Sequence, residues 1–201
     1  MELDSSYTEF KENLGTCESS AGYLSLPGRI TNWKDQDEGV SAQRLELDNG
    51  EQVIETNDDG SIWIPFREID ERNRINFELS SNDQLNRGLS TTDIIKIRRH
   101  LLAHEEFISP WEKIAADVNN SETITTIDII ILQKVIVGQL ENFINNDSWR
   151  FVSRDYEFPR PDNPWYEEFD AKWQLDLCGR LRADMIAIKI GDVDCSYIDE
   201  L

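Results

Sequence analysis

The sequence predicts an α+β protein in which an N-terminal antiparallel β-sandwich precedes a pair of loop–helix repeats. Apolar and polar residues alternate over residues 22–81, whereas the apolar spacing becomes helical between residue 82 and about residue 143. Alternation with a period of two is typical of half-buried strands, and a spacing of three to four residues is typical of helices. We therefore divide the chain into a polar arm (1–21), a sandwich (22–81), a repeat module (82–143) and an extended C-terminal segment (144–201) whose strands pack back on the module.

The predicted strands of the sandwich each place their apolar residues on one face. They contain Leu45 and Leu47, then Ile62, Ile64 and Phe66, then Ile75, Phe77 and Leu79. The triplets Asp-Asn-Gly at 48–50 and Asp-Asp-Gly at 58–60 are turn signals between these runs. Several short strands at this spacing indicate a small antiparallel sandwich.

Two predicted helices form an internal repeat. Residues 93–104 place Ile94, Ile97 and Leu101 on one stripe, and residues 128–138 repeat the pattern up to Gly138, which is a natural stop. The heptapeptide LSTTDII at 89–95 matches ITTIDII at 124–130, 35 residues later. Two copies of such a unit can bury their apolar faces against each other.

The C-terminal segment contains two further predicted strands, residues 149–152 and 185–190. Between them, the stretch FPRPDNPW at 158–165 is expected to be extended because its prolines block a helix.

The chain is strongly acidic, with 40 Asp and Glu against 20 Lys and Arg and a formal net charge of -20. This field repels phosphate backbones and argues against nucleic-acid binding. It suits cation binding, or a soluble protein in a salty medium. No apolar run reaches membrane-spanning length, and the start of the chain predicts no secretion signal, so we expect either a cytosolic protein or a piece of a longer exported chain.

Three cysteines, Cys17, Cys178 and Cys195, are too few for a disulfide framework or a structural zinc site. If the protein is exported, one disulfide is conceivable, and the suggested pair is Cys178 with Cys195.

Residues 117–128 have the spacing of an EF-hand-like calcium loop of twelve residues. Oxygen ligands are expected from Asp117, Asn119, Ser121, the Thr123 carbonyl, Thr125 and Asp128. Calcium takes six to eight oxygens in flexible geometry, and this spacing wraps a chain around one ion. Glu122 is unfavourable because glycine normally makes the sharp turn there. The alternative is a polar turn that caps a helix.

The first copy of the repeat predicts a poorer loop. Asn82, Gln84 and Asn86 fall at positions 1, 3 and 5, with Ser90 and Asp93 at positions 9 and 12, so no acid opens the loop. Near the C-terminus, Asp192, Asp194 and Ser196 resemble the opening of another calcium loop that has no closing acid. Our hypothesis is that the C-terminal strand folds back, so that Asp192 and Asp194 complete the site around Ser90 and Asp93. An exposed acidic tail is the alternative.

Several separate motifs, in order, resemble the dockerin-like C-terminal regions of secreted or surface bacterial proteins. The matching stretches are LNRGLSTTD (85–93), RHLL (99–102), SPWEKIAADVNNSETITTID (109–128), NNDSWRFV (145–152), FPRPDNPW (158–165) and IKIGDVD (188–194). Two departures are Arg87, inserted before Gly88, and Asp194, where the pattern usually has Asn. The sandwich more weakly resembles carboxypeptidase-regulatory-like or collagen-adhesin B-type domains, which have an immunoglobulin-like or prealbumin-like fold.

The resemblance implies a calcium-stabilised structural or interaction module of an exported, extracellular or cell-surface protein, such as an adhesin, a filament or a component of an enzyme complex. It implies Ca²⁺ as the cofactor. It further implies a protein partner, either cohesin-like or a neighbouring subunit.

Two other functions compete with this interpretation. Trp149, Trp165, Tyr166 and Trp173 could form an aromatic platform for carbohydrate, although tryptophans at this density more often pack in a core. An enzyme is not expected: His100 and His104 are four residues apart, but no third metal ligand, phosphate loop or nucleophile motif accompanies them.

Overall fold

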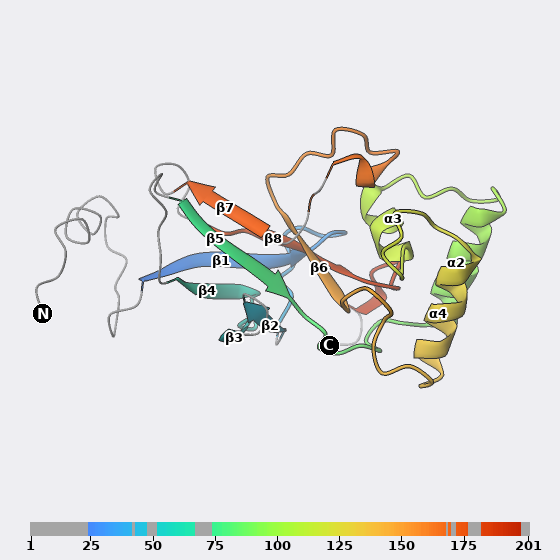
Figure 1. Cartoon of the computed structure of the whole chain (residues 1–201), viewed down its shortest axis with the longest axis horizontal. Coiled ribbons are helices and arrows are strands. Elements are labelled where there is room, and N and C mark those ends of the chain that lie inside the picture. The colour runs from blue at the N-terminus through green and yellow to red at the C-terminus, as the bar shows by residue number, and fades with distance from the viewer. Residues whose placement is uncertain are drawn as a thin grey trace, which may run out of the picture.

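The computed structural model describes residues 24–41, 43–47, 52–66, 74–167, 169, 172–176 and 182–197, and within these ranges it shows two four-stranded sheets and three α-helices. The predicted polar arm and two of the cysteines, Cys17 and Cys178, lie outside the described residues. The α+β class is confirmed. The helices gather at one end of the molecule and the strands at the other (Figure 1).

The first sheet has the order β4-β1-β8-β6. Its strands are β1 (Leu24–Asn32), β4 (Ser61–Phe66), β6 (Trp149–Ser153) and β8 (Met185–Lys189). β1 pairs with β4 and β8 pairs with β6 in antiparallel fashion, but β1 and β8 run parallel, with Ile30 opposite Met185. The paired strands that the structure describes within residues 22–81 are all antiparallel, as predicted, and the parallel pair arises because β8, from the C-terminal segment, joins their sheet. A parallel pair needs a long crossover, and here the connection contains the whole helical module.

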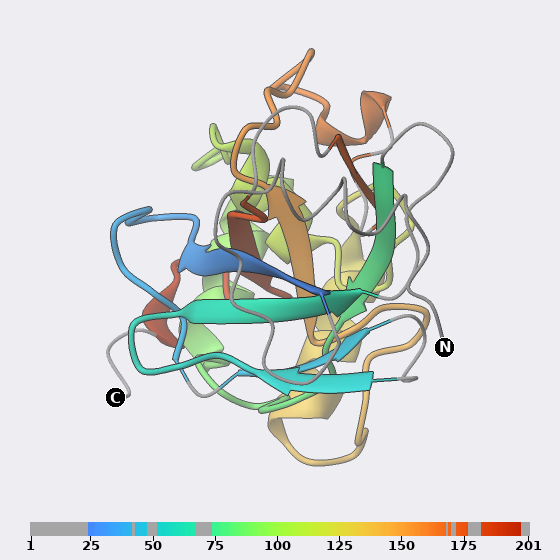
Figure 2. The same cartoon turned by 90° about the vertical axis from the view of Figure 1, so that its left-hand side faces the viewer.

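The second sheet has the order β3-β2-β5-β7. Its strands are β2 (Arg44–Leu47), β3 (Gln52–Glu55), β5 (Arg74–Ser80) and β7 (Lys172–Asp176), all paired antiparallel. Figure 2 shows the molecule along its long axis, with β5 (green) and β6 (orange) upright and β4 (teal) lying across the view. β7 and β8 both come from the C-terminal segment, so each sheet contains a strand from beyond residue 144 as well as strands from residues 22–81.

Two buried clusters fill the interior. The first joins side chains of both sheets, including Leu26, Ile64 and Leu79, with the aromatic rings of Trp149 and Phe151. The second joins the helices to the other face of β8. It includes Ile97, Ile114, Leu132, Val152 and Ile188.

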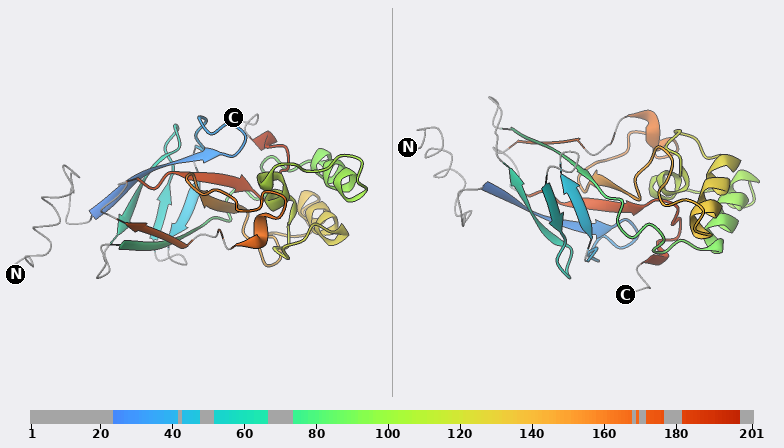
Figure 3. Two further views of the ribbon diagram at one scale, coloured as in Figure 1. Left: turned by 90° about the horizontal axis from the view of Figure 1, so that it is seen from above. Right: turned by 60° about the horizontal axis from the view of Figure 1, so that its bottom comes forward.

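β8 is buried along its whole length, which explains the nearly continuous apolar run MIAIKI at 185–190. Met185 and Ala187 belong to the first cluster, and Ile188 and Ile190 belong to the second. β8 thus contributes side chains to both cores, and it leads the chain from the sheet to the helical end (Figure 3).

The helical end consists of α2 (Thr91–Leu101), α3 (Pro110–Ala116) and α4 (Thr126–Ile136). Ser90, Ser109 and Thr125 cap the three helices, each within a capping box. α2 and α4 are the two predicted repeat helices, whereas the sequence pattern did not predict α3. The proline-rich stretch is not wholly extended, because Pro164 begins the short 3₁₀ helix η1 (Pro164–Tyr166).

Candidate metal sites

The loop of residues 117–128, which we call the continuous loop, connects α3 to α4 and buries its two aspartates, Asp117 and Asp128. Asp117 ends α3, and its carboxylate accepts the backbone N–H groups of Ser121 and Glu122, both at 2.8 Å. Asp128 accepts the N–H groups of Asn119 at 3.2 Å and of Thr125 at 2.8 Å. Both carboxylates have zero exposure, so the chain wraps completely around them.

The turn at the centre of the continuous loop has the left-handed conformation that glycine normally supplies. Asn120 has φ 54° and Glu122 has φ 61°. Glu122 therefore adopts the sharp turn that made it unfavourable in the sequence. A positive φ costs a non-glycine residue free energy, and the surrounding hydrogen bonds of the loop hold it there.

Oxygen atoms converge inside the continuous loop. One end of the Asn119 side-chain amide lies 3.0 Å from Asp128 Oδ1, 2.8 Å from Ser121 Oγ and 3.1 Å from Asp117 Oδ1. If the amide nitrogen faces inward, it donates to these atoms and ties the loop together. If the oxygen faces inward, four oxygens come together inside the loop, and a bound cation would stabilise that arrangement. The Ser121 hydroxyl also lies 3.2 Å from the Thr123 carbonyl oxygen, which extends this group.

A second group of carboxylates lies where the C-terminal chain meets α2. One oxygen from each of Asp93, Asp192 and Asp194 lies within 4.8 Å of the others. We call residues 88–93 together with 192–196 the split loop. Asp192 follows β8 directly, while Asp93 is in the first turn of α2, so segments about one hundred residues apart in the chain form one site.

The split loop repeats the hydrogen bonds of the continuous loop. Asp192 accepts the N–H groups of Ser196 at 3.0 Å and Tyr197 at 2.9 Å, four and five residues ahead, as Asp117 does. Asp93 accepts the N–H of Ser90 at 2.8 Å, as Asp128 accepts that of Thr125. Asp93 also accepts the N–H of Val193, at position 2, at 3.0 Å, whereas Asp128 accepts the N–H of the next position, Asn119.

The equivalence extends to the remaining positions. The Ser196 hydroxyl donates to the Gly88 carbonyl at 3.0 Å, as the Ser121 hydroxyl donates to the Thr123 carbonyl. Cys195 has φ 60° and corresponds to Asn120. Positions 1, 3 and 5 of the split loop are thus Asp192, Asp194 and Ser196, and positions 7, 9 and 12 are Gly88, Ser90 and Asp93.

Two glycines allow the segments of the split loop to approach. A Cβ atom on Gly88 (φ 74°) would lie 2.4 Å from Asp192 Oδ2, so no other residue fits there without displacing the Asp192 carboxylate. Gly191 (φ 88°) donates its N–H to the Ala115 carbonyl at 2.8 Å, which ties the end of β8 to α3. Gly88 and Ser196 complete the site, yet only the recurring D-x-[DN]-x-S pattern in the sequence pointed to Ser196, and no signal selected Gly88.

Burial disfavours the ionised forms of two of the three carboxylates in the split loop. Burial is the main cause that raises the pKa of Asp93 to about 6 and that of Asp192 to about 7, against the opposing effect of the backbone hydrogen bonds that they accept, and the neighbouring carboxylates contribute to the rise. Burial also works to raise the pKa of Asp194, but the hydrogen bond from Lys96 and its positive charge outweigh this effect and lower it. The Asp194 Oδ1 atom is buried and has no hydrogen-bond partner within the described part of the chain.

Burial also disfavours the ionised form of a carboxylate in the continuous loop, but less strongly. Burial raises the pKa of Asp117, against the opposing effect of the two backbone hydrogen bonds it accepts. Carboxylates whose ionised form is disfavoured are the groups that a bound cation stabilises.

The predicted ligands Asn82 and Asn86 do not join the split loop as expected. The Asn82 side chain donates to Asp147 at 2.9 Å and accepts the N–H of Ser148 at 3.0 Å, so it anchors the start of β6 instead. Asn86 accepts the N–H of Leu89 through its backbone carbonyl within a turn. Asp192 and Asp194, from the C-terminal chain, lie near Asp93 in place of these asparagines.

The predicted aromatic platform is contradicted at Trp149. This side chain is 1% exposed, donates its indole N–H to the Asp83 carbonyl at 2.9 Å and packs edge-on against Tyr197. Trp165 is half-buried, and Tyr166 is exposed with the Arg160 guanidinium 3.9 Å above its ring. The side chain of Trp173 lies outside the described residues.

The two histidines and the one described cysteine form no shared site. His100 accepts the N–H of Phe107 and stacks on its ring, while His104 is exposed. Cys195 is free and buried, and its suggested partner, Cys178, lies outside the described residues.

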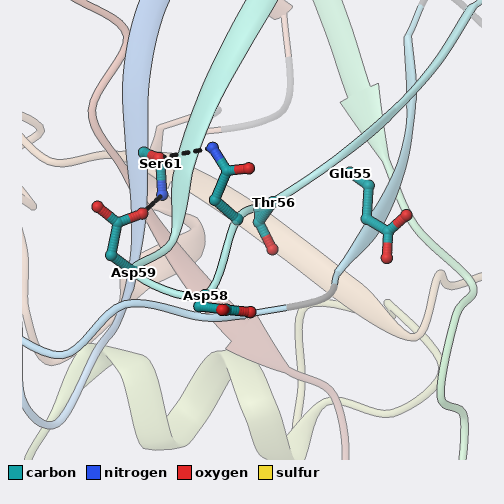
Figure 4. Close-up of a pocket in the computed structure, with 6 residues that line it drawn as sticks. Glu55, Thr56, Asp58, Asp59 and Ser61 are labelled. Atoms are coloured by element: carbon teal, nitrogen blue, oxygen red, sulfur yellow. Dashed lines mark hydrogen bonds between the residues drawn. The ribbon is translucent and has the colours of Figure 1, made fainter.

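A further acidic hollow lies at the turn between β3 and β4. It has a volume of about 550 Å³ and is lined by Glu55, Thr56, Asn57, Asp58, Asp59 and Ser61 (Figure 4). The Asp59 carboxylate accepts the N–H of Ser61 and thereby stabilises the turn. Glu55, Asp58 and Asp59 are all exposed to solvent, unlike the acids of the two loops.

Comparisons with protein-family models, with curated proteins and with solved structures find no match for this chain. Within the residues that the structure describes, no helix is long and apolar enough to cross a membrane.

Proposed function

We propose that the protein is a two-site calcium-binding module in which the continuous loop and the split loop each hold one Ca²⁺ ion. The observation that carries this proposal is the repetition of one hydrogen-bond pattern in two loops, one of which is assembled from distant segments. A polar turn that only capped a helix would need no carboxylate from the C-terminal chain.

The donor sets fit calcium. Each loop offers carboxylates at positions 1 and 12, a side-chain oxygen at positions 3 and 5 and a backbone carbonyl at position 7. These hard oxygen donors suit Ca²⁺, which accepts six to eight of them at 2.3–2.6 Å, whereas no histidine or cysteine side chain lies among them to favour a softer metal.

Helix capping does not compete with this role. Asp93 and Asp128 cap their helices through Oδ2, which accepts the N–H groups of Ser90 and Thr125. A bound ion would use the oxygens that face the interior of each loop. The cap therefore orients the ligand at position 12 before calcium arrives, which reduces the entropy lost on binding.

In this function calcium stabilises the fold and holds the C-terminal chain against α2. We propose that such a module serves as a structural or protein-interaction part of an exported bacterial protein, in line with the dockerin-like motifs. Extracellular calcium, at about millimolar concentration, would fill even sites at the weak end of the known range.

The test compares thermal unfolding of the whole chain in EDTA and in calcium, together with calorimetric stoichiometry. Free calcium at one hundred times Kd adds about 2.7 kcal/mol per site, or roughly 5–10 °C in Tm for a chain of this size. Two sites are expected in the native chain and one in the Asp192→Ala, Asp194→Ala double variant. The control Asp58→Ala removes an acid of the exposed hollow and should leave both sites intact. Absence of binding heat and of a Tm change in the native chain would overturn the proposal.

Carbohydrate binding finds less support. Of the suggested aromatic residues, Trp149 is in the core, and one face of Tyr166 is covered by Arg160. Among the described residues, no pair of aromatic side chains supports carbohydrate binding as well as the two loops support calcium binding.

A further inference from the structure

The two loops differ at position 3, and the helices that contain their closing acids differ at one nearby position. Position 3 is Asn119 in the continuous loop but Asp194 in the split loop. Three residues after the closing acid, α4 has Ile131, whereas α2 has Lys96. The loop with the extra carboxylate is thus also the loop with an ammonium group nearby.

Lys96 and Asp194 form an ion pair. The Lys96 Nζ lies 3.0 Å from Asp194 Oδ2, and the two side chains are 36% and 19% exposed. Ile131, at the equivalent place in α4, is buried and packs in the second core cluster. Lys34, from the segment after β1, donates at 2.9 Å to the backbone carbonyl of Asp194, not to its carboxylate.

The geometry leaves one oxygen of Asp194 for another cation. Lys96 pairs with Oδ2, while Oδ1 is buried without a hydrogen-bond partner in the described chain. Lys96 can therefore remain paired while Oδ1 contributes to a metal site with Asp93 and Asp192.

We propose that Lys96 is the built-in counter-ion of the split loop and sets its calcium affinity. This inference rests on the proposed function and extends it to the regulation of one site. Three carboxylates with one ammonium carry a net charge of minus two, which equals the charge of the two carboxylates in the continuous loop. Without calcium, Lys96 keeps the charge repulsion low enough for the C-terminal chain to stay docked.

The test is a double-mutant cycle on the whole chain, with calcium titrations followed residue by residue through amide NMR shifts. The Val193 amide reports on the split loop because it donates to Asp93, and the Asn119 amide reports on the continuous loop because it donates to Asp128. Lys96→Met should tighten calcium binding at the split loop roughly tenfold, because a nearby positive charge no longer opposes the ion. Lys134→Met removes an exposed lysine from α4 and is the matched control, for which no change is expected at Val193.

Asp194→Asn should weaken the split loop by about tenfold or more, since it leaves Lys96 beside only two carboxylates. The double variant Lys96→Met, Asp194→Asn should return to within about threefold of the native affinity, because its charges then match those of the continuous loop. Lys96→Arg keeps the charge and should behave as the native chain.

The results of this experiment distinguish failure of the proposed calcium sites from failure of the proposed role of Lys96. If neither amide responds to calcium in the native chain, the proposed function fails and this inference fails with it. If both amides respond but Lys96→Met leaves the split loop unchanged or weaker, only the role of Lys96 is overturned. A double variant whose calcium affinity stays far from that of the native chain would equally overturn the counter-ion role, because the charge balance of Lys96 and Asp194 would then not set the affinity.

Discussion

Gly88 and Asp192 approach so closely that a single added methyl group on Gly88 would collide with a carboxylate oxygen of Asp192. The ideal Cβ position lies 2.4 Å from Asp192 Oδ2, although the two residues are about one hundred positions apart in the chain. This contact marks the point at which the C-terminal chain closes the split loop.

Gly88→Ala should therefore abolish calcium binding at the split loop and leave the continuous loop intact. The matched control is Gly138→Ala, because Gly138 has almost the same φ (71° against 74°) but nothing lies within 4 Å of its Cβ position. Both variants suffer the same backbone strain, so a difference in calorimetric stoichiometry reports on the clash alone. Two sites in Gly88→Ala would contradict the closure we describe.

The calcium-induced rise in Tm should be larger at pH 7 than at pH 5. The raised pKa values of Asp93, about 6, and Asp192, about 7, mean that the folded apo state binds more protons than the unfolded state above pH 3.8. Its free energy of unfolding therefore falls as pH rises through this window, while calcium binding, which needs ionised carboxylates, becomes stronger.

Two other groups titrate in or near this range. Burial lowers the pKa of His100, which adds stability as pH rises, and burial lowers the pKa of Lys189 to about 7, which acts at higher pH. Comparing each pH with and without calcium cancels the His100 contribution because it is common to both states. An equal Tm rise at pH 5 and pH 7 would show that the carboxylates do not titrate with the metal.

Calcium should slow hydrogen exchange at the amides that both loops hold. The amides of Ser196 and Tyr197 donate to Asp192, and those of Ser121 and Glu122 donate to Asp117. With EDTA these amides should exchange sooner than those of β8, since local opening then requires no ion release. Mass spectrometry of peptides covering residues 186–197 and 115–125 measures this, and unchanged exchange at 193–197 would argue against calcium in the split loop.

Trp149→Ala should destabilise the chain by about 3–5 kcal/mol, because it removes a large side chain from the shared core of the two sheets. Trp149 is 1% exposed, whereas the control Trp63 is 59% exposed, so Trp63→Ala should cost less than about 1 kcal/mol. Denaturant unfolding in excess calcium compares the two. A small loss at Trp149 would reopen its assignment to a ligand surface.

The sequence pattern predicted those strands and helices whose apolar spacing is visible within a few consecutive residues. Alternation predicted β2, β4 and β5, short apolar stretches predicted β6 and β8, and the 35-residue repeat predicted α2 and α4. α3 is short and begins at Pro110, so its single turn of apolar residues gave too little periodicity to separate it from a loop. The parallel pairing of β1 with β8 depends on contacts between the two ends of the chain, and no local pattern encodes it.

The candidate metal ligands were likewise easier to predict where they lie close together in the sequence. The spacing of residues 117–128 identified the continuous loop because all its oxygens are close in the sequence. The split loop could be suggested only from two incomplete patterns, and the register was wrong at Asn82 and Asn86. Lys96 has no motif, because its relation to Asp194 becomes visible only when the two loops are compared in space.

The position of β8 between the two cores has a consequence for how the protein is made. Met185–Lys189 is synthesised after the other strands and helices that the structure describes, yet side chains from this strand belong to both buried clusters. Neither cluster is complete until this strand has been made, so the sheet and the helices are expected to gain their stable packing together and not one after the other.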